Sequence, residues 1–576
     1  MRSLIALLSF SPILMAQGAP DPFRFVPADA AFVFRTKGPA GWRSELGATG
    51  LGKALSGGEI GASWKQLVDS AREEIDPEQE HTQSVQAMMD ALVDYSGEVV
   101  VAGRVDFTAA DLEQAPAFAM SFTLNGDGHS DLEAIGKQIA SLLPEGGVER
   151  RLGSQDVQVH QVGALEWTAP FVSEGALVML CGTSLEEQSA PFLEARQAQF
   201  AATPDLRRGV FGLQVEFHEP VRMALDACAR LEDENAKLMV RGLELAGVRS
   251  LQRLTACMFA DGPYVAQEAR CEWNDAARGL FDVVLPVRKS TPKLLAYLPP
   301  HVQNWSIGIF DVAALQVLYG KAFEEFGDLI PQSREEVEGA FTQYTKLRLH
   351  EDFLALFGGE YLRIEDFAAM GDTDTDVDPR LEKLDEKVGD ACFVIQMKDG
   401  KAMAQNLEKA LRARGLHAGR KTEDYGDTKV YRLSLLGSLP IEYAFAGEVF
   451  VLGIGQGEGT QRNVRSVLDM VAARAKGEVA TELSAALQAR MQGWPADWST
   501  IDVGGSDEIL DGFVSAIDGL LPMMAAEGLE PEDLGIWFHC AEFARKLRPA
   551  LSRHGADVSV TAGYSARDVY MMRSRW

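Results

Sequence analysis

Residues 117–122 read AFAMSF, and residues 392–397 read CFVIQM. Both stretches are short and apolar, which is typical of a buried β-strand. Each is followed by apolar residues at a spacing near 3.6, over residues 132–143 after the first and 403–411 after the second, and this spacing predicts a helix. Three more strand-like segments follow in both places. We therefore expect one strand–helix–three-strand unit to occur twice.

Glycine turns and alternating apolar residues mark the last three strands of each unit. Gly153 and Gly426 are the predicted turns. The predicted strands are 157–162, the segment around Trp167 and 176–180 in the first unit, and 429–433, 441–445 and 449–452 in the second. The matching order indicates an internal repeat. Each half also ends in predicted paired strands, at 254–273 and at 558–576.

A charged break between Pro286 and Pro292 separates the two halves of the chain. We predict two similar α+β domains, over residues 19–287 and 288–576, each a largely antiparallel sheet with helices packed on one face. The alternative is that the two halves are unrelated α+β domains that share generic patterns.

The Pro-Ala-Asp opening at 27–29, the Gly-Glu turn at 97–98 and the strand–helix–three-strand unit resemble a large group of bacterial exported proteins with domains of unknown function. The resemblance covers most of the chain from Phe25 onward and rests on loose patterns. It implies an exported and often duplicated α+β fold, and it transfers no catalytic residues to this chain.

The first eighteen residues have the features of a secretory signal peptide. Arg2 supplies a positive charge, residues 4–15 form an apolar core broken at Pro12, and small residues occur within 16–19. This core is too short to span a bilayer, which takes about 20 residues. We therefore predict that residues 1–18 are removed and that the mature protein is periplasmic or extracellular, with no integral membrane span. The alternative is a buried N-terminal helix.

The net charge of the chain bears on its partners. Its 576 residues include 55 basic and 84 acidic side chains, a balance of −29. An acidic surface repels phosphate backbones, so we expect no nucleic-acid partner. The 46% apolar and 24% charged composition is that of a globular protein, which excludes a disordered or fibrous chain.

Two glycine-rich stretches approach nucleotide-binding motifs and fail at one position each. In residues 47–54, Ala54 stands where a phosphate-binding loop needs the hydroxyl that binds Mg²⁺. In residues 453–459, Glu458 stands where a dinucleotide fingerprint needs glycine. We interpret the first as a turn that begins a helix and the second as a loop before a helix at 464–473, and we predict no cofactor.

Four alternating carboxylates could supply oxygen ligands to Ca²⁺. They are Asp372, Asp374, Asp376 and Asp378. An EF-hand loop counted from the first of them would need glycine at position six and glutamate at position twelve, and neither is present. We interpret the segment as a solvated acidic loop, with a calcium site as the alternative.

Histidine and serine motifs give no catalytic site. The nine histidines lack the spacing of a zinc site, and no Gly-x-Ser-x-Gly elbow occurs. We therefore predict no catalytic, metal-binding or cofactor-binding residues. Cys257 and Cys271 lie on the two arms of the predicted hairpin at 254–273, where the sequence allows either a disulfide or two thiols. The other cysteines are expected to be buried thiols.

Three functions remain open. The first hypothesis is a non-enzymatic exported protein that binds a protein or another envelope component, or acts as a scaffold. The second is an exported hydrolase with a non-standard site. The third is a carrier of an apolar ligand held between helices and sheet. The sequence does not predict the oligomeric state.

Overall fold

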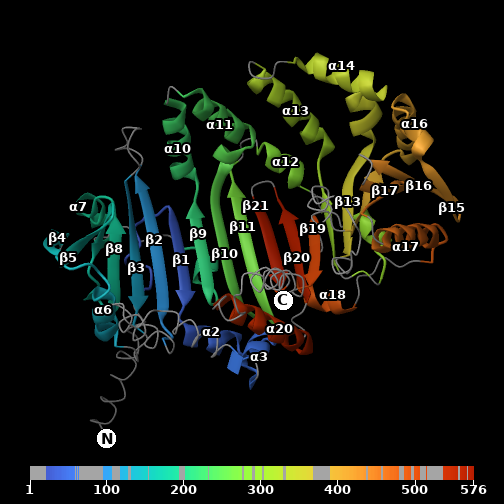
Figure 1. Ribbon diagram of the computed structural model, residues 1–576. Coiled ribbons are helices and arrows are strands. Elements are labelled where there is room, and N and C mark those ends of the chain that lie inside the picture. The colour runs from blue at the N-terminus through green and yellow to red at the C-terminus, as the bar shows by residue number, and fades with distance from the viewer. Residues whose placement is uncertain are drawn as a thin grey trace, which may run out of the picture. The chain divides into compact units, whose positions relative to one another are not determined.

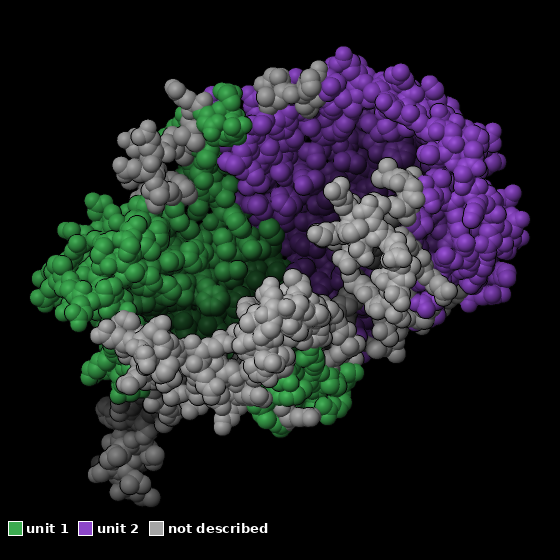
Figure 2. All heavy atoms as spheres, in the orientation of Figure 1, with its two compact units in different colours: residues 1–236, 252–271, 513–554 green, residues 237–251, 272–512, 555–576 purple. Residues whose placement is uncertain are grey.

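The structure is a computed structural model of the chain. It describes residues 21–576 apart from residues 59, 61, 64–94, 107–116, 127–130, 154, 194–201, 231–232, 275–277, 288–291, 301, 303, 328–331, 367–389, 436–438, 456–457, 479–484, 495–497, 506–513, 515–535, 555–557 and 567–568. The chain forms two compact units, coloured separately in Figure 2. Unit 1 comprises residues 1–236, 252–271 and 513–554, and unit 2 comprises residues 237–251, 272–512 and 555–576.

Unit 1 is built on an antiparallel sheet (Figure 1). Its strands are, in spatial order, β4 (Val148–Leu152), β5 (Gln155–Val162), β6 (Leu165–Thr168), β8 (Ala176–Gly182), β3 (Ala117–Asn125), β2 (Glu98–Asp106), β1 (Phe32–Lys37), β9 (Phe211–Glu216) and β10 (Leu251–Asp261). The short β7 (Phe171–Ser173) also pairs with β8, and β11 (Tyr264–Trp273) follows β10 across a turn at Gly262. The predicted strands 117–122, 157–162 and 176–180 are confirmed as parts of β3, β5 and β8.

Unit 2 is also built on an antiparallel sheet. Its strands are, in spatial order, β21 (Val569–Arg575), β20 (Val558–Ser565), β19 (Thr500–Gly505), β12 (Asn304–Ile309), β13 (Phe357–Asp366), β14 (Asp390–Met397), β18 (Val449–Ile454), β17 (Leu439–Ala446), β16 (Thr428–Leu435) and β15 (Lys421–Tyr425). The predicted strands 392–397, 429–433, 441–445 and 449–452 are confirmed as β14, β16, β17 and β18. The mixture of helices and antiparallel sheet confirms the α+β class.

The helices connect these strands. Those of unit 1 are α2 (Pro39–Leu46), α3 (Gly50–Ser56), α6 (Leu132–Ala140), α7 (Leu185–Gln188), α8 (Ala190–Leu193), α9 (Pro204–Arg207), α10 (His218–Arg230) and α20 (Ile536–Arg553). Those of unit 2 are α11 (Glu234–Leu245, from residue 237), α12 (Leu280–Val284), α13 (Val312–Phe326), α14 (Arg334–Thr345), α16 (Gly400–Ala413), α17 (Glu458–Ala475) and α18 (Ala485–Arg490). Shorter turns of helix are η2 (Val248–Ser250), η3 (Lys293–Tyr297), η4 (Leu349–Phe353), η5 (Leu354–Leu356) and η7 (Leu416–Gly419).

The sequence-based prediction misses several strands, among them β4 and β15. These two read VERRL and KTEDY, and most of their side chains are exposed. Because charged residues replace the apolar ones, the alternation that marks a half-buried strand is absent. Within the described residues, β4 pairs with β5 and β15 pairs with β16. Charged side chains on such edge strands hinder pairing with other chains.

The prediction that helices pack on one face of the sheet is wrong for unit 2. On β18, Val451 belongs to the core that contains Val464 of α17. The next residue, Leu452, packs into a separate cluster with Leu411 of α16. Successive side chains of a strand point to opposite faces, so the two helices cover opposite faces of these strands. The strands are apolar on both faces, and each face is therefore buried under a helix.

Each unit contains helical residues from the other half of the sequence. In unit 1, α20 packs against α3, and Lys546 Nζ donates a hydrogen bond to Ser63 Oγ at 3.0 Å. In unit 2, Arg241 of α11 donates to the backbone oxygen of Glu325 on α13 at 3.3 Å. The two predicted domains, 19–287 and 288–576, are thus interleaved in the two units.

Candidate functional site

The glycine-rich stretch at 47–54 joins two helices of unit 1. Thr49 Oγ1 accepts a hydrogen bond from the backbone N–H of Gly52 at 3.0 Å, and this contact caps the N-terminus of α3. The preceding element is α2, whereas a phosphate-binding loop follows a strand. The interpretation of this stretch as a turn that begins a helix is confirmed.

The second glycine-rich stretch connects β18 to α17. The helix begins at Glu458, earlier than the predicted start at 464. A Cβ atom at Gly453 would lie 2.6 Å from Thr460 Cγ2 and 2.7 Å from Val464 Cγ2. This glycine therefore lets α17 lie directly on the strand, which explains its presence by packing.

Three predicted features lie outside the described residues. They are the signal peptide at 1–18, the start of the second predicted domain at 288–291, and the acidic segment with Asp372, Asp374, Asp376 and Asp378. Each stays a prediction.

No disulfide joins Cys257 to Cys271. The Cys257 sulfur accepts a hydrogen bond from the backbone of Glu268 on β11, and its side chain lies on the same face as the Glu268 carboxylate. Cys271 is three positions farther along β11, an odd number that turns its side chain to the opposite face. Burial, together with the charges of Asp205 and Glu268, raises the pKa of Cys257 to about 12. The thiol is therefore protonated at neutral pH and unreactive.

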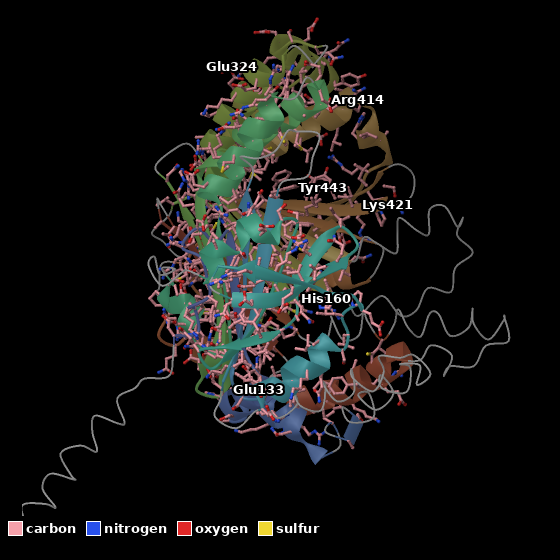
Figure 3. The ribbon with its side chains drawn as sticks, turned by 90° about the vertical axis from the view of Figure 1, so that its left-hand side faces the viewer. Glu133, His160, Glu324, Arg414, Lys421 and Tyr443 are labelled. Atoms are coloured by element: carbon pink, nitrogen blue, oxygen red, sulfur yellow. The ribbon has the colours of Figure 1, made fainter. Side chains whose placement is uncertain are left out.

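Two of the described histidines, His160 and His350, contact neighbouring polar groups. His160 on β5 is labelled in Figure 3, and its Nδ1 lies 2.7 Å from the Pro144 carbonyl oxygen. His350 Nε2 lies 3.0 Å from Glu338 Oε1. Both contacts hold the local structure. Neither contact places its histidine beside a nucleophile.

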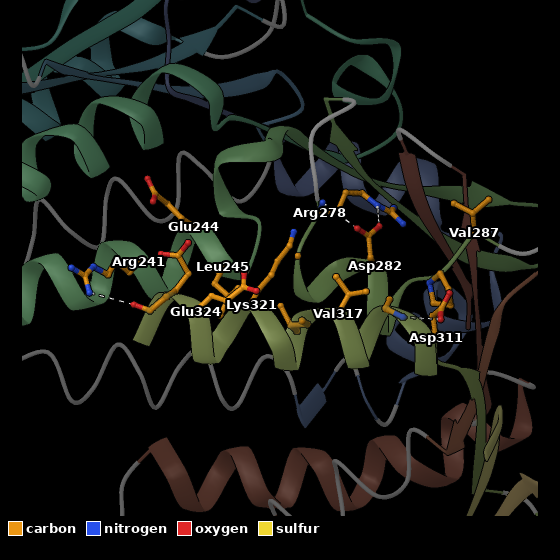
Figure 4. Close-up of a pocket in the computed structure, with 15 residues that line it drawn as sticks. Arg241, Glu244, Leu245, Arg278, Asp282, Val287, Asp311, Val317, Lys321 and Glu324 are labelled. Carbon is orange, nitrogen blue, oxygen red and sulfur yellow. Dashed lines mark hydrogen bonds and ion pairs between the residues drawn. The ribbon is translucent and has the colours of Figure 1, made fainter. Parts of the chain in front are cut away.

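A cavity of about 620 Å³ opens in unit 2 among α11, α12 and α13 (Figure 4). Its lining residues are Arg241, Glu244, Leu245, Arg278, Gly279, Asp282, Pro286, Val287, Asp311, Ala314, Val317, Leu318, Lys321, Glu324 and Glu325. Five of these side chains are carboxylates and three are cations, and the others are apolar residues or glycine. We name this the helical cavity.

Several of the charges around the helical cavity are used to hold its walls. Arg278 is only 5% exposed, and its Nε lies 2.9 Å from Asp282 Oδ1. The Asp311 carboxylate accepts from the first backbone amides of α13 and so caps that helix. Glu244 pairs with Arg249 at 2.6 Å. These groups build the cavity and leave little capacity for a ligand.

Other groups on α13 remain available. Lys321 and Glu324 are exposed, lie about one helical turn apart, and have no hydrogen-bond or ion-pair partner among the described residues. Val317 is 59% exposed and Val287 is 48% exposed, although both are apolar. In Figure 4 the Lys321 side chain extends from α13 beside Val317 and Glu324. A ligand here would meet apolar surface flanked by one free cation and one free carboxylate.

The lining of the helical cavity combines charged side chains with apolar surface. The described lining residues include no serine, threonine, cysteine or histidine. Sequence reasoning missed the site because its residues come from three segments, 241–245, 278–287 and 311–325, that only the fold brings together. Val317 is an apolar residue of α13 whose exposure only the fold reveals.

Within the described part of the chain, no helix is both long enough and apolar enough to cross a membrane. No model of a known protein family matches the sequence, and no curated protein matches it significantly.

Solved structures with partial similarity include three crystal forms of the protein TP0453. Form III is 10% identical with a TM-score of 0.23, and the match covers 45% of this chain and 83% of TP0453. Form I is 12% identical with a TM-score of 0.22, covering 45% and 82%. Form IV is 10% identical with a TM-score of 0.23, covering 44% and 80%. Scores this low give no information about function.

Proposed function

We propose that this chain is an exported, non-enzymatic binding protein that holds a segment of a partner protein in the helical cavity. The observation that carries the proposal is the lining of that cavity, to which exposed Val317 and Val287 contribute apolar surface and Lys321 and Glu324 contribute charge. An amphipathic peptide segment matches this combination of apolar surface and free charge.

The charges that line the helical cavity favour a positively charged segment of the partner protein. The lining carries five carboxylates against three cations, and the whole chain carries a net charge of −29. A segment with net positive charge and one or two apolar side chains complements both. Because the charges at the rim are exposed, their attraction is screened by salt. The hypothesis of a purely apolar ligand fits less well, since eight charged side chains line the cavity.

We also propose that the two halves of the chain are copies of one ancestral domain. The strand orders support this. When β1 to β11 are aligned with β12 to β21, corresponding strands have corresponding neighbours in the sheet, and the short β7 is an addition in the first copy.

Matching residues also support the duplication. Asp131 and Asp399 each cap the helix that follows the third strand of their copy. Glu166 on β6 and Glu442 on β17 each lie opposite a glycine of the neighbouring strand. Each of these two glutamates also pairs with an arginine, at 2.7 Å for Glu166 and 3.0 Å for Glu442. Such agreement in detail is unexpected for two unrelated domains.

A site-specific crosslink tests the binding proposal. A photo-activated residue at position 317 should form one discrete adduct with an envelope protein, because Val317 faces the helical cavity. Val148 on β4 is the matched control, since it is 58% exposed but belongs to unit 1. A crosslinker at position 148 should give no such adduct. The adduct at position 317 should weaken as salt is raised.

Substitutions at the same two positions give an independent measurement. Val317→Arg should reduce capture of the crosslinked partner at least tenfold, whereas Val148→Arg should leave it unchanged. Equal capture by both variants, or adducts of equal yield at both positions, would contradict a site in the helical cavity. Amino-terminal sequencing of the secreted protein tests export separately: a retained Met1 counts against it.

A further inference from the structure

Three groups that can bind a metal converge in unit 1. They are the carboxylate of Asp205 at α9, the thiol of Cys257 on β10 and the carboxylate of Glu268 on β11. One ligand atom from each lies within 4.8 Å of the other two. The three residues come from separate elements, so α9 and the paired strands β10 and β11 together fix their arrangement.

The surroundings of the thiol are unusual for a buried cysteine. Cys257 is only 2% exposed and packs with Phe259 and Ala266 in a small apolar cluster. Buried cysteines commonly behave as small apolar side chains among apolar neighbours. Here two carboxylates face the sulfur, and Arg208, which pairs with Glu268, supplies one positive charge against their two negative charges.

We propose that Asp205, Cys257 and Glu268 form a binding site for a divalent transition-metal ion of the zinc class. A thiolate and two carboxylate oxygens are all accepted zinc ligands, and three protein ligands leave a fourth position for water. Binding would release the thiol proton to solvent as the sulfur becomes a ligand. A hard ion such as Mg²⁺ is disfavoured because it prefers oxygen ligands only.

The present contacts of the two carboxylates are compatible with the binding of a metal ion. Arg208 pairs with Glu268 at 3.2 Å, and its own side chain is 45% exposed, so it can move outward when a metal replaces its charge. Thr255 Oγ1 donates to Asp205 at 3.3 Å, a long contact that can persist as support for the ligand. The competing interpretation is that the existing contacts of the carboxylates satisfy them and that Cys257 is a core residue.

Cobalt substitution distinguishes the two interpretations. The full-length protein, freed of metal with a chelator, is titrated with Co²⁺ under reducing conditions. A site that includes Cys257 gives a thiolate-to-cobalt charge-transfer band in the near ultraviolet at one equivalent of Co²⁺, and Zn²⁺ removes the band by displacement. The band should be absent from Cys257→Ser and retained by Cys271→Ser, because Cys271 faces the other side of the hairpin.

The carboxylate variants Asp205→Asn and Glu268→Gln keep the test informative if the cysteine variant fails to fold. Each should keep the fold and weaken Zn²⁺ binding at least tenfold in calorimetry. Absence of the band in the unmodified protein overturns the proposal. So does a band that survives Cys257→Ser, or Zn²⁺ binding that neither carboxylate variant weakens.

Discussion

At the scale of single residues, the carboxylate of Glu442 in unit 2 is a buried charge held by two arginines. It is 5% exposed, and its Oε1 lies 3.0 Å from Arg432 Nε and 3.4 Å from an Arg465 nitrogen. Glu423, which is 48% exposed, pairs with the same two arginines. The two glutamates thus make similar contacts at very different depths. Depth is what decides their energetic value, because a buried charge left without its partner cannot be solvated.

We expect Glu442→Ala to lower the free energy of unfolding by about 2 kcal/mol, below the full cost of breaking a buried pair because both arginines are partly exposed. Glu423→Ala is the matched control and should cost less than about 1 kcal/mol, since solvent screens an exposed pair. Urea unfolding of the two variants measures both values. Equal losses would mean that burial does not govern this network.

At the scale of elements, two glycines of unit 2 have opposite roles. Gly453 on β18 lies directly beneath α17, where a Cβ atom would approach two side chains of that helix to 2.6 and 2.7 Å. Gly339 lies inside α14, and a Cβ atom there would meet nothing within 4 Å. The first glycine is required by packing, whereas the second only adds conformational freedom to the unfolded chain.

We expect alanine to act with opposite sign at these two positions. Gly453→Ala should destabilise unit 2 by about 1–3 kcal/mol, because α17 must shift to admit the methyl group. Gly339→Ala should stabilise the protein by about 0.5–1 kcal/mol, because it improves a helix interior at no steric cost. Thermal unfolding of the two variants and of the unmodified protein measures both changes in stability. A stabilising Gly453→Ala would show that the strand and helix are not in close contact.

The sequence predicted elements well where burial follows a simple period. The alternation along 157–162 and the helical spacing over 403–411 both correspond to observed elements, β5 and α16. Prediction failed where the physical signal is not local. The charged edge strand β15 has no apolar alternation. Nor does any pattern along the chain indicate that α16 and α17 cover opposite faces of one group of strands.

The candidate sites illustrate the same limit more sharply. Asp205, Cys257 and Glu268 are individually ordinary residues, and only the hairpin of β10 and β11 and the adjoining turn bring them together. Lys321 is likewise one lysine among many in the sequence. It becomes notable because the fold gives it an exposed position in a cavity, where the described residues offer it no partner. Rules based on residue spacing detect a site whose residues lie on one helix, strand or loop. Each of these two candidate sites takes its residues from three separate elements.

At the scale of the whole molecule, the two halves of the sequence are exchanged between the two units. Residues 513–554 belong to unit 1, and residues 237–251 and 272–287 belong to unit 2. The exchanged helix α20 buries Ala541, Ala544 and Leu551. Neither half of the sequence therefore contains all of the apolar contacts of either unit, although each half contains a complete set of strands.

This exchange predicts how the protein behaves when it is divided at 287/288. A fragment of residues 19–287 lacks α20 and exposes the surface of α3, and a fragment of residues 288–576 lacks α11 and α12 beside α13. Each fragment alone should bind a hydrophobic dye and unfold without a cooperative transition. When the two are expressed together, they should elute as one complex whose near-ultraviolet circular dichroism matches that of the intact chain. As a control, full-length protein that is folded first and then cleaved at an engineered protease site at 287/288 should stay associated. Two fragments that each fold cooperatively alone and do not associate would show that the exchanged helices contribute little, and the halves would then be independent domains joined in tandem.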